Sequence, residues 1–134
     1  MGMRSFIHSL TAPALASVSA GEYKMAIIVN HSLGMKKGKI AAQVAHGAVS
    51  ATLKANPALL EAWFSSGQAK VTLKGTDEEQ LLDLNKKAKA AGLNSCIIRD
   101  AGRTQIPSGS LTVVAIGPAL KEHLNQITGD MKLL

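Results

Sequence analysis

The chain has 134 residues, a net charge of +6, and 46% hydrophobic residues with only 3% aromatic residues. This length fits one domain with an aliphatic core. The single cysteine excludes an intramolecular disulfide and a zinc site built from several cysteines. We therefore expect Cys96, which lies in an apolar run, to be a buried thiol. No apolar run reaches the roughly 18 residues that a membrane span needs, so we expect no membrane partner.

The positive charge is unevenly distributed along the sequence. Four of the nine carboxylates lie within residues 77–83, which leaves 15 Lys and Arg against five Asp and Glu elsewhere. A surface with such an excess of cations suits a polyanion such as nucleic acid, although basic charge also serves plain solubility. The scarcity of aromatic residues argues against recognition by base stacking.

Residues 1–24 differ in composition from the remainder. They are rich in Ser, Ala and Thr and hold two basic residues, Arg4 and Lys24. Polar residues interrupt the apolar run before the small residues at 18–20, which argues against a secretory signal. An organelle-targeting segment or a start-site extension remain as alternatives, and we expect a dispensable extension. The domain is predicted to cover residues 25–134.

From Met25 onward, strand and helix signals alternate. The sequence predicts strands at 25–29, 70–74, 93–99 and 111–116. It predicts helices at about 38–53, 57–65 and 77–91, the third of them initiated by a capping box over Thr76-Asp77-Glu78-Glu79. A last helix is predicted to open at Gly117-Pro118 and to end at Gly129.

This order predicts an α/β fold: a three-layer α/β/α arrangement with a mixed four-stranded sheet. Strands separated by helices pair in parallel through right-handed crossovers. The last two strands have no helix between them, so we expect one antiparallel pair. The strand order does not follow from the sequence.

The first stretch that carries chemistry runs from Met35 to Ala48. A basic turn containing Gly38 leads into a helix whose amino terminus, with its free N–H groups, favours anions. Helical spacing puts Lys39, Gln43, His46 and Ser50 on one stripe, next to an apolar face of Ile40, Ala41, Val44 and Ala48. His46 has two interpretations, a proton shuttle beside a site or a structural histidine, and the small neighbouring residues favour the second.

The second stretch is the segment 100–110, between the last two strands. Asp100, Arg103, Thr104 and Gln105 supply a carboxylate, a cation and two neutral hydrogen-bonding groups. Sites in open α/β sheets form beyond the carboxyl ends of parallel strands. If the strands at 25–29 and 93–99 are parallel, Lys39 and Asp100 emerge at the same edge, and we expect both side chains to be partly exposed. The alternative is a polar turn without function.

Both stretches resemble the two signatures of the second type of peptidyl-tRNA hydrolase. Met35-Lys36-Lys37-Gly38-Lys39-Ile40-Ala41-Ala42-Gln43 is similar to the first, and Asp100-Ala101-Gly102-Arg103-Thr104-Gln105-Ile106 to the second. The similarity extends over residues 25–134. Lys36 stands where the first signature has glycine, and Asn30 and Ser32 stand where relatives often carry Arg and Asp.

The resemblance implies a metal-free enzyme that hydrolyses the ester between peptide and tRNA, and some members are homodimers. We expect the protein in the cytoplasm, with organelle targeting by residues 1–24 as the alternative. Carried over by position, Lys39, Asp100 and Thr104 are the expected catalytic residues. The expected substrate-binding residues are Gln43, His46, Arg103, Gln105, Thr112, Lys36 and Lys37. No cofactor is expected.

Two other functions compete with hydrolysis. A non-catalytic RNA-binding or partner-binding module would keep the basic surface, but it would not need Lys39, Asp100 and Thr104 together. A nucleotide-phosphate binder is weaker, because Lys37-Gly38-Lys39 lacks the spacing of a phosphate loop.

Overall fold

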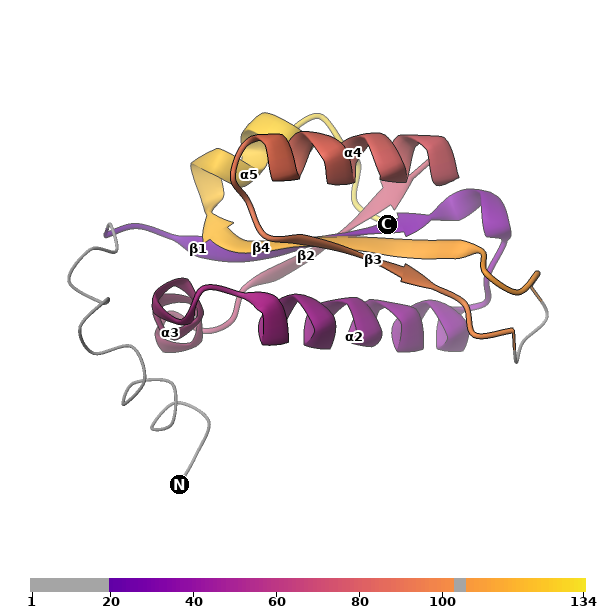
Figure 1. The fold of residues 1–134 in the computed structure, drawn as a ribbon, viewed down its shortest axis with the longest axis horizontal. Coiled ribbons are helices and arrows are strands. Elements are labelled where there is room, and N and C mark those ends of the chain that lie inside the picture. Colours follow the sequence, from indigo (N-terminus) through magenta and orange to yellow (C-terminus); the bar gives the residue numbers. More distant parts are fainter. Residues whose placement is uncertain (1–19, 103–105) are drawn as a thin grey trace, which may run out of the picture.

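The computed structural model describes residues 20–102 and 106–134. Their elements, in chain order, are β1 (Tyr23–Asn30), the 3-10 turn η1 (His31–Leu33), α2 (Lys37–Lys54), α3 (Pro57–Ser65), β2 (Lys70–Gly75), α4 (Glu78–Ala90), β3 (Ser95–Arg99), β4 (Leu111–Leu120) and α5 (Lys121–Thr128). Figure 1 shows them in three layers, with α2 and α3 on one face of the sheet and α4 and α5 on the other. The predicted α/β/α class is confirmed.

The strands are ordered β2-β1-β4-β3. β1 pairs in parallel with β2 and antiparallel with β4, and β4 pairs antiparallel with β3. β1, β2 and β3 therefore point the same way, and β4 alone is reversed. This arrangement confirms the mixed sheet, the parallel β1 and β3, and the antiparallel pair at the end.

The core has two halves, because alternate residues of a strand face opposite sides of a sheet. Met25, Ile27 and Val29 of β1 face α2 and α3, while Ala26 and Ile28 face α4 and α5. All five are essentially inaccessible to solvent. Cys96 belongs to the first half and is buried, as expected.

The predicted start of the last helix at Gly117-Pro118 is wrong. β4 continues through both residues to Leu120, and α5 begins at Lys121. Tyr23 and Lys24 provide the reason, since they pair with Leu120 and Ala119 and lengthen the ladder beyond the predicted ends. The same pairing means that β1 begins at Tyr23, two residues before the predicted start.

Smaller boundary differences have local causes. β3 begins at Ser95 rather than at Leu93, because Leu93 N–H instead bonds Ala88 O at the end of α4. The box that starts α4 is shifted by one residue: the Asp77 carboxylate accepts from Gln80 N–H, and the Gln80 side chain accepts from Thr76 N–H. No helix in the described part of the chain combines the length and apolarity that a membrane crossing requires.

Candidate active site

The two chemistry-bearing segments meet at one end of the sheet. β1 leads through η1 to the start of α2, and β3 leads directly to Asp100. Because β1 and β3 are parallel, both connections leave from the same edge, on the right in Figure 1. The predicted convergence of Lys39 and Asp100 is therefore present in the fold.

Lys39 and Asp100 form an ion pair that bridges 61 positions of sequence. The Lys39 ammonium donates to Asp100 Oδ1, and the two side chains are 11% and 2% exposed. The expectation that both would be partly exposed is wrong for Asp100. The backbone of Gly109 and Ser110 pairs with that of Asp100, and the Lys39 ammonium contacts the Asp100 carboxylate, so the carboxylate is shielded from water.

The backbone holds Asp100 in place on both sides. Asp100 N–H donates to Ser110 O at 2.8 Å, and Gly109 N–H donates to Asp100 O at 3.0 Å. The second carboxylate oxygen, Oδ2, accepts from Gly102 N–H at 2.8 Å. Gly102 has a φ of 83°, a conformation that favours glycine, and a Cβ there would lie 2.7 Å from Ser108 Oγ. The carboxylate is thus fixed before any ligand arrives.

A further ion pair closes the neck of this loop. Arg99 Nη1 donates to Glu78 Oε1 at 3.1 Å and to Gly109 O at 2.9 Å. Glu78 Oε1 also accepts from Leu111 N–H at 3.3 Å. The sequence interpretation missed this clamp and explained Glu78 only as a helix-initiating acid. The sequence does show a cation, Arg99, directly before the loop, but only the fold identifies Glu78 as its partner.

Gln43 lies one turn after Lys39 on α2 and is buried, although it belongs to the predicted polar stripe. Thr112 Oγ1 donates to Gln43 Oε1 at 2.6 Å, and both residues are buried. α2 can approach the sheet here because Gly47 follows one turn later, where a Cβ would lie 3.0 Å from Val113 Cγ2. The fully buried residues of α2 are therefore Gln43, Gly47 and Ala51, while Ile40, Val44 and Ala48 of the predicted apolar face pack against the core and are partly buried.

A cavity of about 590 Å³ opens beside the ion pair, between α2 and β3. Its lining from α2 includes Lys39, Gln43, His46 and Ser50, the residues that the helical spacing placed on one stripe. From β3 and the loop it includes Ile98, Arg99, Asp100 and Ala101. His46 is exposed at this border and does not pack in the core.

The remaining predicted site residues either lie away from the cavity beside the ion pair or fall outside the residues that the structure describes. Lys36 and Lys37 are exposed at the start of α2, where they line a second hollow on its opposite flank. Arg103, Thr104 and Gln105 fall outside the described residues.

Asn30, which stands where relatives often carry a different residue, has a structural role. Its side-chain amide donates to Leu111 O at 2.9 Å, and its Oδ1 accepts from Ser32 N–H at 3.1 Å and from the Ser32 hydroxyl. Asn30 therefore ties the end of β1 to the start of β4, and Ser32 holds the Asn30 side chain in place.

These side chains suit attack by water on a carbonyl. A fixed carboxylate can accept a proton from water, and a neighbouring ammonium can stabilise negative charge on a carbonyl oxygen. Cys96 is unsuited to be a nucleophile, because burial raises the pKa of its thiol. Among the described residues, no group of three His, Cys, Asp or Glu side chains is placed to hold a metal ion.

Comparison with known proteins places the chain in a family. Residues 23–134 match the family described as "Peptidyl-tRNA hydrolase PTH2". The chain is 48% identical over 122 residues to "Peptidyl-tRNA hydrolase 2" of Saccharomyces cerevisiae, covering 84% of this chain and 59% of the relative. It is 46% identical over 116 residues to "Peptidyl-tRNA hydrolase" of Thermococcus sibiricus, covering 84% of this chain and 98% of the relative.

A bovine relative, "Peptidyl-tRNA hydrolase 2, mitochondrial", is 49% identical over 117 residues, which cover 85% of this chain and 65% of the relative. The chain thus spans less than two thirds of the yeast and bovine proteins but nearly all of the archaeal one. A match over almost the whole domain, together with these identities, shows that the chain belongs to the PTH2 family of peptidyl-tRNA hydrolases.

Proposed function

We propose that the protein hydrolyses the ester that joins a peptide to the 3′ ribose of tRNA, and thereby releases tRNA for reuse. The observation that carries this proposal is the shielded Lys39–Asp100 ion pair beside an open cavity, in a chain of this family. The relatives are named as hydrolases, which does not favour a non-catalytic binding module.

In this proposal Asp100 accepts a proton from the attacking water or orients that water. The water oxygen forms a bond to the ester carbonyl carbon, and Lys39 stabilises the resulting oxyanion. The bond from that carbon to the ribose oxygen then breaks, and the ribose oxygen takes up the proton that the water lost, delivered from Asp100 or through solvent. Gln43, whose amide is oriented by Thr112, and Thr104 position the carbonyl or the 2′-hydroxyl.

The remaining site residues are assigned to the substrate. Lys36, Lys37 and Arg103 contact the phosphate backbone of tRNA, which would make binding sensitive to salt. His46 and Gln105 border the reacting ester. The uncapped start of α2, which has no acidic residue in its first turn, supports a negatively charged ligand at this end.

The direct test uses N-acetyl-aminoacyl-tRNA with a labelled amino acid. The protein should release labelled N-acetyl-amino acid, and free aminoacyl-tRNA should be cleaved far more slowly. Asp100→Asn serves as the inactive control. Intact N-acetyl-aminoacyl-tRNA after incubation with folded protein would refute the proposed activity.

We further propose that the protein works in the cytoplasm, with organelle targeting by residues 1–24 as the alternative. The bovine relative is named as mitochondrial, which supports that alternative. Fluorescent fusions with and without residues 1–24 would distinguish the two. A homodimer is a further expectation from the family, to be tested by light scattering at several concentrations.

A further inference from the structure

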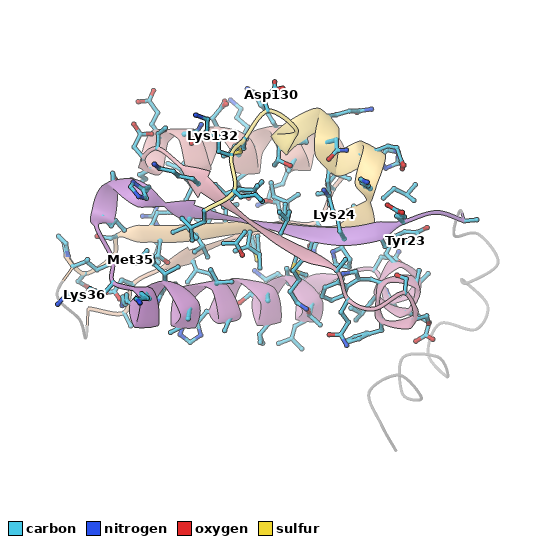
Figure 2. The ribbon with its side chains drawn as sticks, turned by 180° about the vertical axis from the view of Figure 1, so that it is seen from behind. Tyr23, Lys24, Met35, Lys36, Asp130 and Lys132 are labelled. Carbon is cyan, nitrogen blue, oxygen red and sulfur yellow. The ribbon has the colours of Figure 1, made fainter. Side chains whose placement is uncertain are left out.

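The second hollow lies on the opposite flank of α2 from the Lys39–Asp100 cavity. It has a volume of about 780 Å³, and its lining includes Met35, Ile40, Ala41 and Val44, with Thr72 of β2 and Leu134. Figure 2 shows this side, with Met35 and Lys36 at the start of α2 and the segment carrying Lys132 running toward β2. This hollow is larger than the cavity beside the ion pair, and the proposed reaction does not use it.

The helix α2 contributes side chains to both hollows, from two different faces. Ile40, Ala41 and Val44 face the second hollow, while Lys39, Gln43 and His46 face the first. Lys36 and Lys37 border the second hollow where α2 begins, at the end of the helix whose Lys39 pairs with Asp100. A ligand held at the ion pair would thus reach the second hollow by passing around the start of α2.

The lining indicates which part of the substrate would occupy the second hollow. It is made mainly of aliphatic side chains and Met35, and it contains no aromatic ring on which a base could stack. An apolar surface next to a site for an acylated RNA suits the aliphatic side chains of the acyl part.

The width of a helix is compatible with a peptide that passes around the start of α2. A helix is about 10–12 Å across with its side chains, and an extended chain advances about 3.3–3.6 Å per residue. About three to four residues therefore separate an ester at Asp100 from the second hollow. We propose that the second hollow is a subsite for apolar side chains of the bound peptide, at about the third to fifth residue from the ester. This inference rests on the proposed ester hydrolysis.

The test compares two pentapeptidyl-tRNAs on the same tRNA. They differ only at the third to fifth residues from the ester, which are Leu in one and Asn in the other. We expect the Leu substrate to have a KM about tenfold lower, since burying an aliphatic side chain is worth at least that factor. Equal KM values for the two substrates would overturn the subsite.

A matched pair of variants locates the effect. Ala41→Glu puts a charge into the second hollow, whereas Ala45→Glu puts the same charge one turn further along α2, at an exposed position outside that lining. Ala41→Glu should remove the preference for Leu, and Ala45→Glu should keep it. Met35→Gln is a second variant that lies before the helix and should weaken the preference. A preference that survives in Ala41→Glu, or is lost equally in Ala45→Glu, would overturn the assignment.

The outcomes separate this inference from the proposed function. N-acetyl-alanyl-tRNA is too short to reach the second hollow. If wild-type protein cleaves it but shows no preference between the pentapeptides, only the subsite fails. If wild-type protein cleaves none of the three substrates, the proposed hydrolysis itself fails, and the subsite with it.

Discussion

Lys39 and Asp100 are not equivalent in their burial, and the difference governs how their variants should behave. Asp100 is almost fully enclosed, whereas Lys39 keeps some access to solvent and can turn its ammonium outward. Removal of the Lys39 ammonium takes a counter-ion away from a buried carboxylate, which is the costlier loss. Removal of the carboxylate charge leaves a cation that water can solvate.

We therefore predict that Asp100→Asn and Lys39→Met each lower kcat by at least about a hundredfold. The double variant should be much less impaired than the product of the single effects, because residues that act as a unit are not additive. Lys39→Met should also lower the free energy of unfolding by about 3 kcal/mol, more than Asp100→Asn does. Single-turnover kinetics and urea denaturation measure these quantities. Near-normal kcat in Asp100→Asn would refute the mechanism.

The hydroxyl of Thr112 supports the site indirectly, through Gln43. Thr112→Val should leave the Gln43 oxygen buried without its donor, at a cost of about 1–3 kcal/mol in unfolding free energy. It should also lower kcat/KM, because the Gln43 amide loses its fixed orientation. Thr112→Ser keeps the hydroxyl and should behave almost like the wild type in both assays. Equal losses in the two variants would show that the methyl group, not the hydrogen bond, matters.

At the scale of elements, the first turn of α4 anchors the loop that carries Asp100. Glu78 contacts Arg99 at the end of β3 and Leu111 at the start of β4, so one carboxylate joins both ends of the loop. The ion pair itself is about half exposed, and exposed pairs contribute little stability. Its effect should therefore appear in the geometry of the loop and not in global stability.

Accordingly, Glu78→Gln should lower kcat severalfold while the melting temperature changes by only a few degrees. Glu79→Gln is the matched control, since Glu79 lies in the same turn, is exposed and carries the same charge near the helix start. Steady-state kinetics of both variants on one substrate provides the comparison. If Glu79→Gln reduces kcat to the same extent, the helix charge and not the clamp is responsible.

At the scale of the whole molecule, exposed lysines lie on both faces of the sheet, on α2 and on α4. Lys36 and Lys37 lie where α2 starts, on the face of the sheet opposite to α4. Substrate binding should weaken as salt rises, because each phosphate contact releases counter-ions. Lys37→Glu should raise KM more than it lowers kcat. Lys86→Glu, an exposed substitution of the same charge on α4, should leave KM nearly unchanged. A KM for full-length tRNA substrate that does not vary with salt would contradict this assignment.

The boundary of the domain can also be tested on the whole molecule. Tyr23 is buried in the core beside Met25, so a deletion of residues 1–24 removes part of β1. That deletion should lower the unfolding free energy by about 3 kcal/mol, the scale for loss of a large buried side chain. A chain that begins at Ala20 keeps Tyr23 and should melt close to the full-length protein. Thermal melts of both truncations decide the point, and equal melting temperatures would show that Tyr23 does not contribute to the core.

Local signals in the sequence were enough to predict most of the helices and strands. They also indicated that the segments carrying Lys39 and Asp100 converge. Asn56 before Pro57 placed the start of α3, because an N-cap and a first-turn proline act within a few residues. The order of strands and helices favoured parallel β1 and β3, and on that condition the sequence placed Lys39 and Asp100 at one edge. The first inference needed only the capping preferences of neighbouring residues, and the second needed only the direction of the strands.

Tertiary structure decided what depends on contacts between distant residues. Pairing with Tyr23 and Lys24 carries β4 through Gly117 and Pro118, against the local signal for a helix start. The close approach at Gly47 turns Gln43 inward to Thr112, and the folded loop encloses Asp100. Burial and helix rotation are set by the summed packing of several elements. No single segment of sequence contains that information.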